Sequence, residues 1–300
     1  MKTYIELEKY FEEKVKDAKK GSKRSEGQAL TEQGYFYYYC GINLWSFELN
    51  RPPFIESAPT PLEWKESEDF YTFFGTLPKD LTFKDLFEKA EGIYKNAISL
   101  FETVSEDENY PNLFGKTNKE QAEIMASFID IRKQKADAFM RLIMISDYLD
   151  KTKEEINFVM DNAEKFYKEL ADRGGLASVL MQRAYRERYR TYDMEKTRKY
   201  LEEAIVLFRE TGGHTEVASC LSKIADTYHP AGMGANLELW EKYNNEAIDS
   251  FKRGFDLENA LILTCSMIDY FEEIKDKEKV VGYTAKAKAL NTKKTSWPFA

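Results

Sequence analysis

The sequence predicts an all-α protein built as a right-handed α-α superhelix, a solenoid of stacked helical hairpins. Apolar residues recur with helical periodicity along most of the 300 residues. Within those segments an alanine is followed four residues later by an aromatic residue, at Ala97/Phe101, Ala163/Tyr167, Ala204/Phe208 and Ala247/Phe251. The last three pairs are spaced by 41 and 43 residues. A fixed period of about 40 in helical sequence is typical of repeats that bury their apolar faces only against their neighbours.

In the first part of the chain the sequence predicts two helices, over 3–20 and 27–47. The first has one apolar stripe, formed by Tyr4, Ile5, Leu7, Phe11, Val15 and Ala18. An irregular loop is then expected over 48–82, because five of the eight prolines fall there and proline interrupts helices. This loop is also rich in aromatic residues, and one short helix is expected near 66–75. It has two open interpretations, a structural plug or a flap over the neighbouring hairpins.

For the rest of the chain the sequence predicts consecutive helices joined by short turns. They are expected over 83–104, 118–149, 152–172, 175–191, 193–211, 214–228, 235–255, 257–274 and 277–290. Glycine pairs at 174–175 and 212–213 are expected where helices stop, since glycine tolerates the left-handed backbone used there. Residues 1–150 are therefore predicted to form divergent hairpins that include the loop, and residues 151–300 to form regular repeats of one continuous solenoid.

The later units resemble the tetratricopeptide-repeat (TPR) superfamily. In the first helix of a unit, a small residue precedes a tyrosine by three, at Ala225 and Tyr228. In the second helix, alanine, an aromatic residue and a small residue follow at intervals of four and three, as in Ala247, Phe251 and Gly254. The units are longer than the roughly 34 residues of the family, so the chain looks like a long-helix variant. The resemblance implies that the first helix of each unit lines a concave face.

Composition narrows the functional classes. A formal charge of -8 argues against nucleic-acid binding, which depends on many lysine and arginine contacts to phosphates. No segment has the roughly 20 apolar residues needed to span a membrane, and the first residues do not resemble a signal peptide. The three cysteines are expected to be buried thiols in a reducing compartment. A cytoplasmic protein is predicted.

Motifs for catalysis, metals and cofactors are missing from the sequence. His214 and His229 have no second histidine or cysteine at ligand spacing, and both are expected at helix ends. Gly115, Lys116 and Thr117 match only the last part of a phosphate-binding loop, so Thr117 is expected to cap a helix together with Glu120. No metal, no cofactor and no catalytic residue are predicted, and the protein is not expected to be an enzyme.

One basic cluster stands out from the acidic background. Arg183, Arg186 and Arg190 are predicted to share one helical stripe, with Tyr185, Arg188 and Tyr189 between them. Lys223 occupies the place one unit on from Gln182. Arginine binds carboxylates and phosphates in two-point fashion, and tyrosine adds rigid contact area. The predicted binding residues are Arg183, Tyr185, Arg186, Arg190 and Lys223. The alternative is that these arginines pair with acids on the same or adjacent helices, such as Glu187 and Glu195.

The function that best fits this sequence is a non-catalytic scaffold that binds a protein or peptide segment, acidic or phosphorylated, in a concave groove. Three alternatives stay open. The first is a regulatory receptor for a peptide or small ligand, and the second is an enzyme with a site inside the superhelix. The third is a homodimer formed through a terminal repeat, in which the apolar segment 297–300 could dock.

Overall fold

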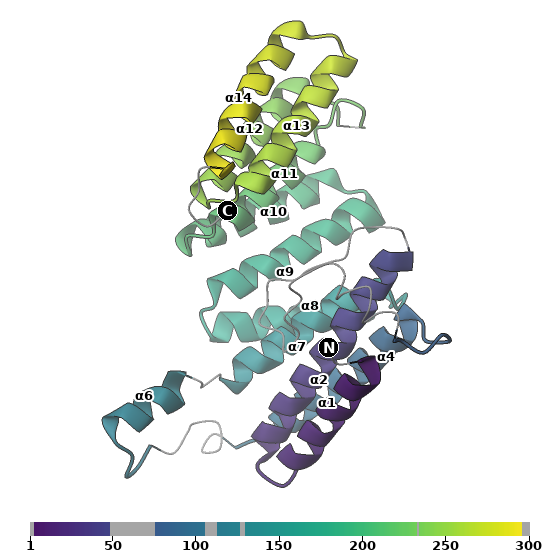
Figure 1. Cartoon of the computed structure of the whole chain (residues 1–300), viewed down its shortest axis with the longest axis vertical. Coiled ribbons are helices and arrows are strands. Elements are labelled where there is room, and N and C mark those ends of the chain that lie inside the picture. Colours follow the sequence, from purple (N-terminus) through teal and green to yellow (C-terminus); the bar gives the residue numbers. More distant parts are fainter. Residues whose placement is uncertain (1–2, 49–75, 106–112, 127–129, 233, 296–300) are drawn as a thin grey trace. The chain divides into compact units, whose positions relative to one another are not determined.

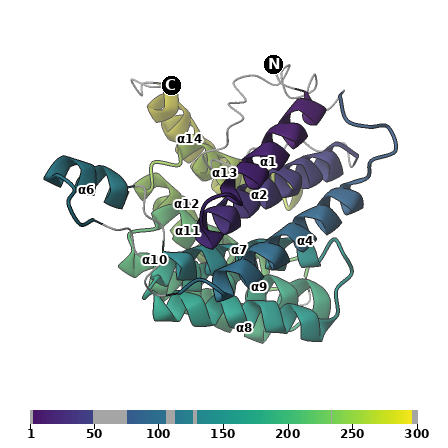
Figure 2. The same cartoon turned by 90° about the horizontal axis from the view of Figure 1, so that it is seen from below.

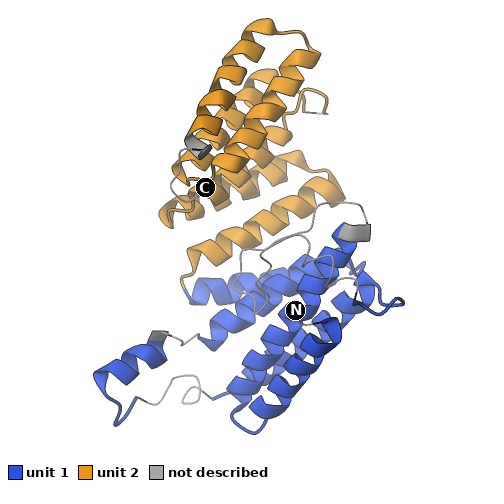
Figure 3. Ribbon diagram, viewed as in Figure 1, with its two compact units in different colours: residues 1–170 blue, residues 171–300 orange. Residues whose placement is uncertain are grey.

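The structure is a computed structural model that describes residues 3–48, 76–105, 113–126, 130–232 and 234–295. All regular elements of these residues are helices, which confirms the predicted all-α fold of packed helical hairpins (Figure 1). The chain divides into two compact units, residues 1–170 and 171–300 (Figure 3). The helices of the first unit are α1 (Tyr4–Ala18), α2 (Lys23–Glu48), α4 (Phe83–Glu102), α6 (Asn118–Ala126), α7 (Ile131–Ser146) and α8 (Lys153–Glu169).

The second unit contains one π-helical turn among its α-helices. Its elements are α9 (Arg173–Arg186), the π-helix η1 (Glu187–Thr191), α10 (Met194–Glu210), α11 (His214–Asp226), α12 (Leu237–Arg253), α13 (Leu257–Glu273) and α14 (Lys277–Thr295). The boundary between the two units follows α8, whereas the sequence places a division at residue 150. Whether residue 150 separates divergent from regular hairpins stays a prediction.

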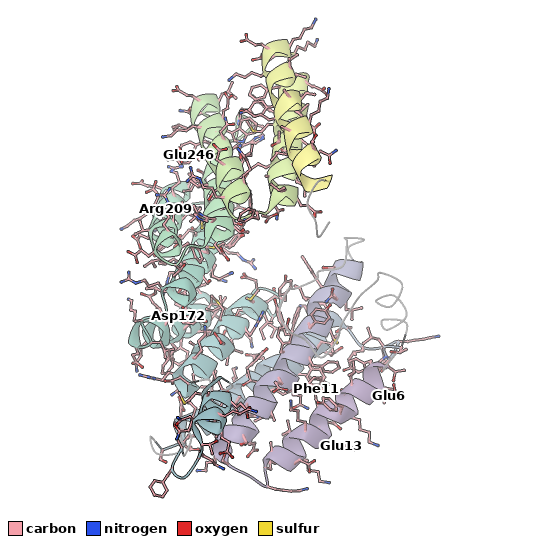
Figure 4. The ribbon with its side chains drawn as sticks, turned by 60° about the vertical axis from the view of Figure 1, so that its left-hand side comes forward. Glu6, Phe11, Glu13, Asp172, Arg209 and Glu246 are labelled. Carbon is pink, nitrogen blue, oxygen red and sulfur yellow. The ribbon has the colours of Figure 1, made fainter. Side chains whose placement is uncertain are left out.

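Helix α1 begins at a capping box, in which the Thr3 side chain accepts from the Glu6 backbone while Glu6 accepts from the Thr3 backbone. Its predicted apolar stripe packs on α2, and Phe11 lies on the side of α1 that faces α2 (Figure 4). The ring of Phe11 stacks on that of Phe36, with centroids 5.1 Å apart. Ile5 is the exception, since 62% of its surface is exposed. The prediction was wrong for Ile5 because the residue after Tyr4 lies about 100° further around the helix, off the face on which Tyr4, Leu7, Phe11 and Val15 are buried.

The long helix predicted over 118–149 is in fact two helices, α6 and α7. Thr117 caps α6 as predicted: the Glu120 backbone donates to its Oγ1 at 3.3 Å, and the Thr117 backbone donates to Glu120 at 2.8 Å. A second start follows at Asp130, whose carboxylate accepts from the Arg132 backbone at 2.7 Å and caps α7. The sequence reading missed this break because the apolar spacing continues across it.

The second unit repeats one hairpin, as the sequence predicts. Within each pair α9/α10, α11/α12 and α13/α14 the helices pack side by side and run in opposite directions (Figure 1). The equivalent residues Ala177, Ala218 and Ala260 are fully buried, as are Ala204 and Ala247 on the second helices. Small side chains at these positions let neighbouring helices approach closely. The described residues therefore place the predicted repeat positions in the core.

A recurrent turn precedes α9, α10, α13 and α14, and before α9 it replaces the glycine stop predicted at 174–175. It places one residue in the left-handed region, at Ala171, Tyr192, Phe255 and Lys275, with φ between 52° and 63°. An aspartate follows and caps the next helix, for example Asp172, which accepts from the Gly175 backbone at 2.8 Å (Figure 4). Gly174 and Gly175 thus open α9 rather than end α8. Gly212, with φ 75°, is used as predicted.

The remaining predictions concern the loop, the C-terminal segment, the cysteines and membrane-spanning helices. Most of the loop 48–82, its short helix near 66–75 and the segment 297–300 lie outside the described residues. Cys40 and Cys220 are buried thiols as predicted, but Cys265 is exposed on α13 because it lies on the face opposite Thr264 and Met267, which are buried. No described helix is long and apolar enough to cross a membrane.

Candidate functional site

The predicted binding residues lie where α9 passes into η1 and on the neighbouring helix α11. After Arg186 the backbone changes from α- to π-helical, and the Asp193 backbone bonds back to the Glu187 carbonyl at 2.9 Å. A π turn contains more residues than an α turn, so the α-helical spacing that predicts one stripe for Arg183, Arg186 and Arg190 does not hold beyond Arg186. Arg183 and Arg186 are half-buried, whereas Arg190 is exposed.

The structure brings two of the predicted residues together. The Lys223 ammonium of α11 lies 4.6 Å from the centre of the Tyr185 ring on α9. The Tyr185 ring in turn stacks on that of Tyr189, with centroids 6.1 Å apart and planes inclined by 16°. A cation over an aromatic face is attracted by the negative charge density of the ring. Lys223 therefore belongs to the same surface as the α9 cluster, although 38 residues separate it from Tyr185.

Arg188 connects η1 to the last turn of α11. Its Nη1 lies 3.1 Å from the Asp226 carboxylate and donates to the Lys223 carbonyl at 3.4 Å. The guanidinium also lies 5.1 Å from the centre of the Tyr189 ring. Only 19% of the Arg188 side chain is exposed. For this arginine the ion-pairing interpretation holds, since it links two hairpins.

Arg183, Arg186 and Arg190 also take part in interactions of their own. Of the two acids proposed as their partners, Glu187 accepts from the Thr191 hydroxyl at 2.6 Å. The choice between a ligand-binding role and lateral ion pairing for these three arginines stays a prediction.

Two tyrosines at this place are exposed to solvent. The exposed fraction is 56% for Tyr189 and 65% for Tyr192. Tyr192 adopts the left-handed conformation with φ 56°, directly before the Asp193 cap of α10. Large exposed aromatic residues beside basic ones are typical of binding surfaces. We define the α9–α11 surface as Tyr185, Arg188, Tyr189, Arg190, Tyr192, Lys223 and Asp226.

The same cation–aromatic arrangement recurs one unit on, with less exposure. Arg198 of α10 lies 4.8 Å from the centre of the Tyr228 ring and donates to the Thr227 hydroxyl at 3.3 Å. Tyr228 stacks on Tyr243 with centroids 5.8 Å apart. Both of these tyrosines are half-buried. The contact itself therefore serves packing between hairpins, and the exposure of Tyr189 and Tyr192 is what distinguishes the α9–α11 surface.

The histidines have structural surroundings. His229 packs edge-on against Trp240, with centroids 5.6 Å apart, and its Nδ1 accepts from the Ala231 backbone at 3.2 Å. His214 opens α11. Within the described part of the chain, no group of three or more histidine, cysteine, aspartate or glutamate side chains could hold a metal ion.

The sequence analysis left Asp226 and Tyr192 out of the candidate site. Asp226 sits in the repeat position of Tyr185, 41 residues on, which would have indicated that it lies on the same face. Tyr192 gave no signal, since an aromatic residue in a turn has no preferred role. No protein-family model matches the chain, and a comparison with curated proteins gives no match. The TPR resemblance therefore stays a prediction.

Proposed function

We propose that this protein is a non-catalytic scaffold that binds an acidic segment of a partner protein at the α9–α11 surface. The observation that supports this most is the pair of exposed tyrosines, Tyr189 and Tyr192, beside the exposed Arg190. Tyrosine supplies large contact area at a low cost in side-chain entropy, and arginine forks bind carboxylates and phosphates at two points.

Charge favours an acidic ligand. The chain has a formal charge of -8, yet the segment 183–190 contains four arginines and one glutamate. An acidic segment would be repelled by most of the protein and attracted here, which favours one orientation of binding. The Arg188–Asp226 pair and the Lys223–Tyr185 contact hold the surface in place before binding, so little reorganisation would oppose association.

The proposal can be tested by selecting peptides of 12 residues from a random display library on the immobilised protein. We expect enrichment of aspartate and glutamate, and tighter binding when a selected serine is phosphorylated. The Tyr189→Ala and Arg190→Glu variants should each weaken the selected peptides about tenfold or more, as expected for central interface residues.

Matched controls are available on exposed positions elsewhere. Arg209→Glu makes the same charge change in the last turn of α10, and Tyr10→Ala removes a tyrosine that is 40% exposed on α1. Both should bind the selected peptides as the wild type does. Selected peptides without acidic residues, or equal binding to Arg190→Glu and Arg209→Glu, would show that the proposal is wrong.

A further inference from the structure

The first unit contains a pocket of about 570 Å³ between α4, α7 and α8. Helix α7 packs against both α4 and α8 (Figure 2). Its side chains form the floor of the pocket, and those of α4 and α8 form the two walls. The volume lies within the range of roughly 300–1,000 Å³ that is typical of small-molecule sites. The sequence analysis did not anticipate it, because a space between three helices leaves no pattern in any one of them.

Apolar side chains form the floor of the pocket. Phe139, Leu142 and Ile145 of α7 and Ile98 of α4 are at most 7% exposed, although all four line it. Phe158 of α8 lies at the edge with 65% of its surface exposed. An apolar lining sheltered from bulk water, next to an exposed aromatic residue, favours an apolar body in the ligand.

The charges at one end of the pocket are already satisfied. Glu91 of α4 binds the ammonium groups of Lys95 at 2.6 Å and Lys151 at 3.0 Å, and only 15% of its side chain is exposed. Burial by itself would raise the pKa of Glu91, but hydrogen bonds from the two lysines outweigh it and hold that pKa below its ordinary value. Because both lysines share this carboxylate, this end does not call for a charged ligand.

At the other end of the pocket the lining has an acid that is not neutralised in this way. Glu102, the last residue of α4, forms no ion pair with any residue that the structure describes. Burial lowers the pKa of Lys135 on α7, and the negative charge of Glu102 opposes this effect. The Lys135 ammonium lies 4.5 Å from the centre of the Phe166 ring rather than in an ion pair with Glu102. Glu155 also lines the pocket, but its carboxylate accepts from the Thr152 backbone at 2.9 Å in the capping box of α8. A cationic group placed beside Glu102 would pair with a carboxylate that the described residues leave without an ion pair, and it would compete there only with the more distant charge of Lys135.

We infer that this pocket binds a small amphiphile whose apolar body lies on the α7 floor and whose cationic group pairs with Glu102. The inference is independent of the α9–α11 surface, which belongs to the other unit. A partner protein that inserts an apolar side chain into the pocket is the competing occupant. It would not need the cationic preference, so the head group of the ligand distinguishes the two.

The test uses three probes with the same tail, namely octylamine, octanol and octanoate, and titration calorimetry on the full chain. We expect octylamine to bind at least fivefold more tightly than octanoate, with octanol between them. The Glu102→Gln variant should bring octylamine to the level of octanol and leave octanol unchanged. Glu88→Gln, an exposed change on the same helix outside the pocket lining, should alter none of the three.

Filling the pocket provides the second arm. Val159→Trp places a large ring at the half-buried wall of α8 and should abolish binding of all three probes, while the far-ultraviolet circular dichroism stays that of the wild type. Leu142→Trp makes the same test from the floor. The inference is overturned if no probe binds, if octanoate binds as tightly as octylamine, or if Glu102→Gln keeps the preference for the amine.

Discussion

Gly41 on α2 lies against the ring of Phe87 on α4, so closely that a Cβ on Gly41 would be 2.8 Å from Phe87 Cε1. The relationship repeats along the two helices, since Gly34 faces Tyr94 and Gly27 faces Phe101. The glycines are seven residues apart and so are the aromatic residues, in opposite chain order, as two antiparallel helices require. All three rings are buried. Missing side chains on α2 thus make room for rings on α4.

The Gly41→Ala variant should destabilise the protein. Overpacking a core costs about 1–3 kcal/mol, and a Cβ within 2.9 Å of two atoms of a fully buried ring has no way to relax. The higher helix propensity of alanine returns about 1 kcal/mol. We expect a net loss of up to about 2 kcal/mol in the free energy of unfolding, measured by urea denaturation.

Gly92 on α4 supplies the matched control, because a Cβ there would meet nothing within 4 Å. Gly92→Ala should gain about 1 kcal/mol from helix propensity alone. The two substitutions are chemically identical, so a difference in sign can come only from the surroundings. Equal stabilisation by both would show that α2 and α4 are not packed as closely as described.

The contacts between the glycines of α2 and the rings of α4 also show which parts of the fold could be predicted from the sequence. The spacing of Ala97 and Phe101 identified one face of α4, and a helix was predicted over 27–47, where α2 lies, because these patterns lie within single helices. The pairing of Gly34 with Tyr94 joins residues 60 apart, and no one-helix pattern indicates which ring meets which glycine. Helix positions were thus predictable, and contacts between helices mostly were not.

The candidate site could likewise be predicted only in part. Repeat equivalence placed Lys223 one unit on from the α9 cluster, and its ammonium does contact Tyr185. The π turn at Glu187 could not be predicted, since its residues have ordinary helix propensities and the widened turn depends on the tertiary surroundings. The sequence therefore predicted Tyr185, Arg190 and Lys223, but neither Tyr192 nor the exposure of the two tyrosines.

The left-handed residues in the turns predict a stabilising substitution at Lys275, which has φ 63° and is exposed. A side chain in this conformation costs about 1–2 kcal/mol, and glycine avoids that cost while losing more entropy on folding. Lys275→Gly should therefore raise the free energy of unfolding by about 0.5–1 kcal/mol. The reverse change, Gly212→Ala at φ 75°, should lower it by about 1 kcal/mol. If both substitutions shifted the urea midpoint the same way, the described turn geometry would be wrong.

Glu8 predicts a pH-dependent part of the stability. Its Oε1 accepts from Tyr37 Oη at 2.9 Å and from Tyr4 Oη at 3.1 Å, and Lys89 Nζ lies at 3.1 Å, so it joins α1, α2 and α4. Burial raises its pKa, but the bonds from Lys89 and the tyrosines outweigh burial and lower it overall. The contribution of Glu8 is therefore complete above the unfolded pKa of about 4.3 and is lost as the pH falls through the lower folded pKa.

We expect Glu8→Gln to lose on the order of 1–2 kcal/mol at pH 7, since hydrogen bonds to a charged acceptor are the stronger ones and this group is partly exposed. The difference from the wild type should shrink between pH 5 and about pH 3 as Glu8 protonates. Glu13→Gln on the exposed face of α1 serves as the control and should change little at either pH. A gap that widens on acidification would rule out this role for Glu8.

The three thiols should differ in reactivity. Burial raises the pKa of the Cys220 thiol to about 12, and burial also raises that of Cys40, which is fully enclosed. Alkylation needs the thiolate and access to it, so iodoacetamide at pH 8 should modify only the exposed Cys265 in the native protein. Mass spectrometry of peptides then distinguishes one modified cysteine from three, and denaturation in urea should expose all three.

Because Cys40 lies in the first unit and Cys220 in the second, the order in which they become reactive with increasing urea would report which unit opens first. Modification of Cys40 without denaturant would contradict the packing of α2.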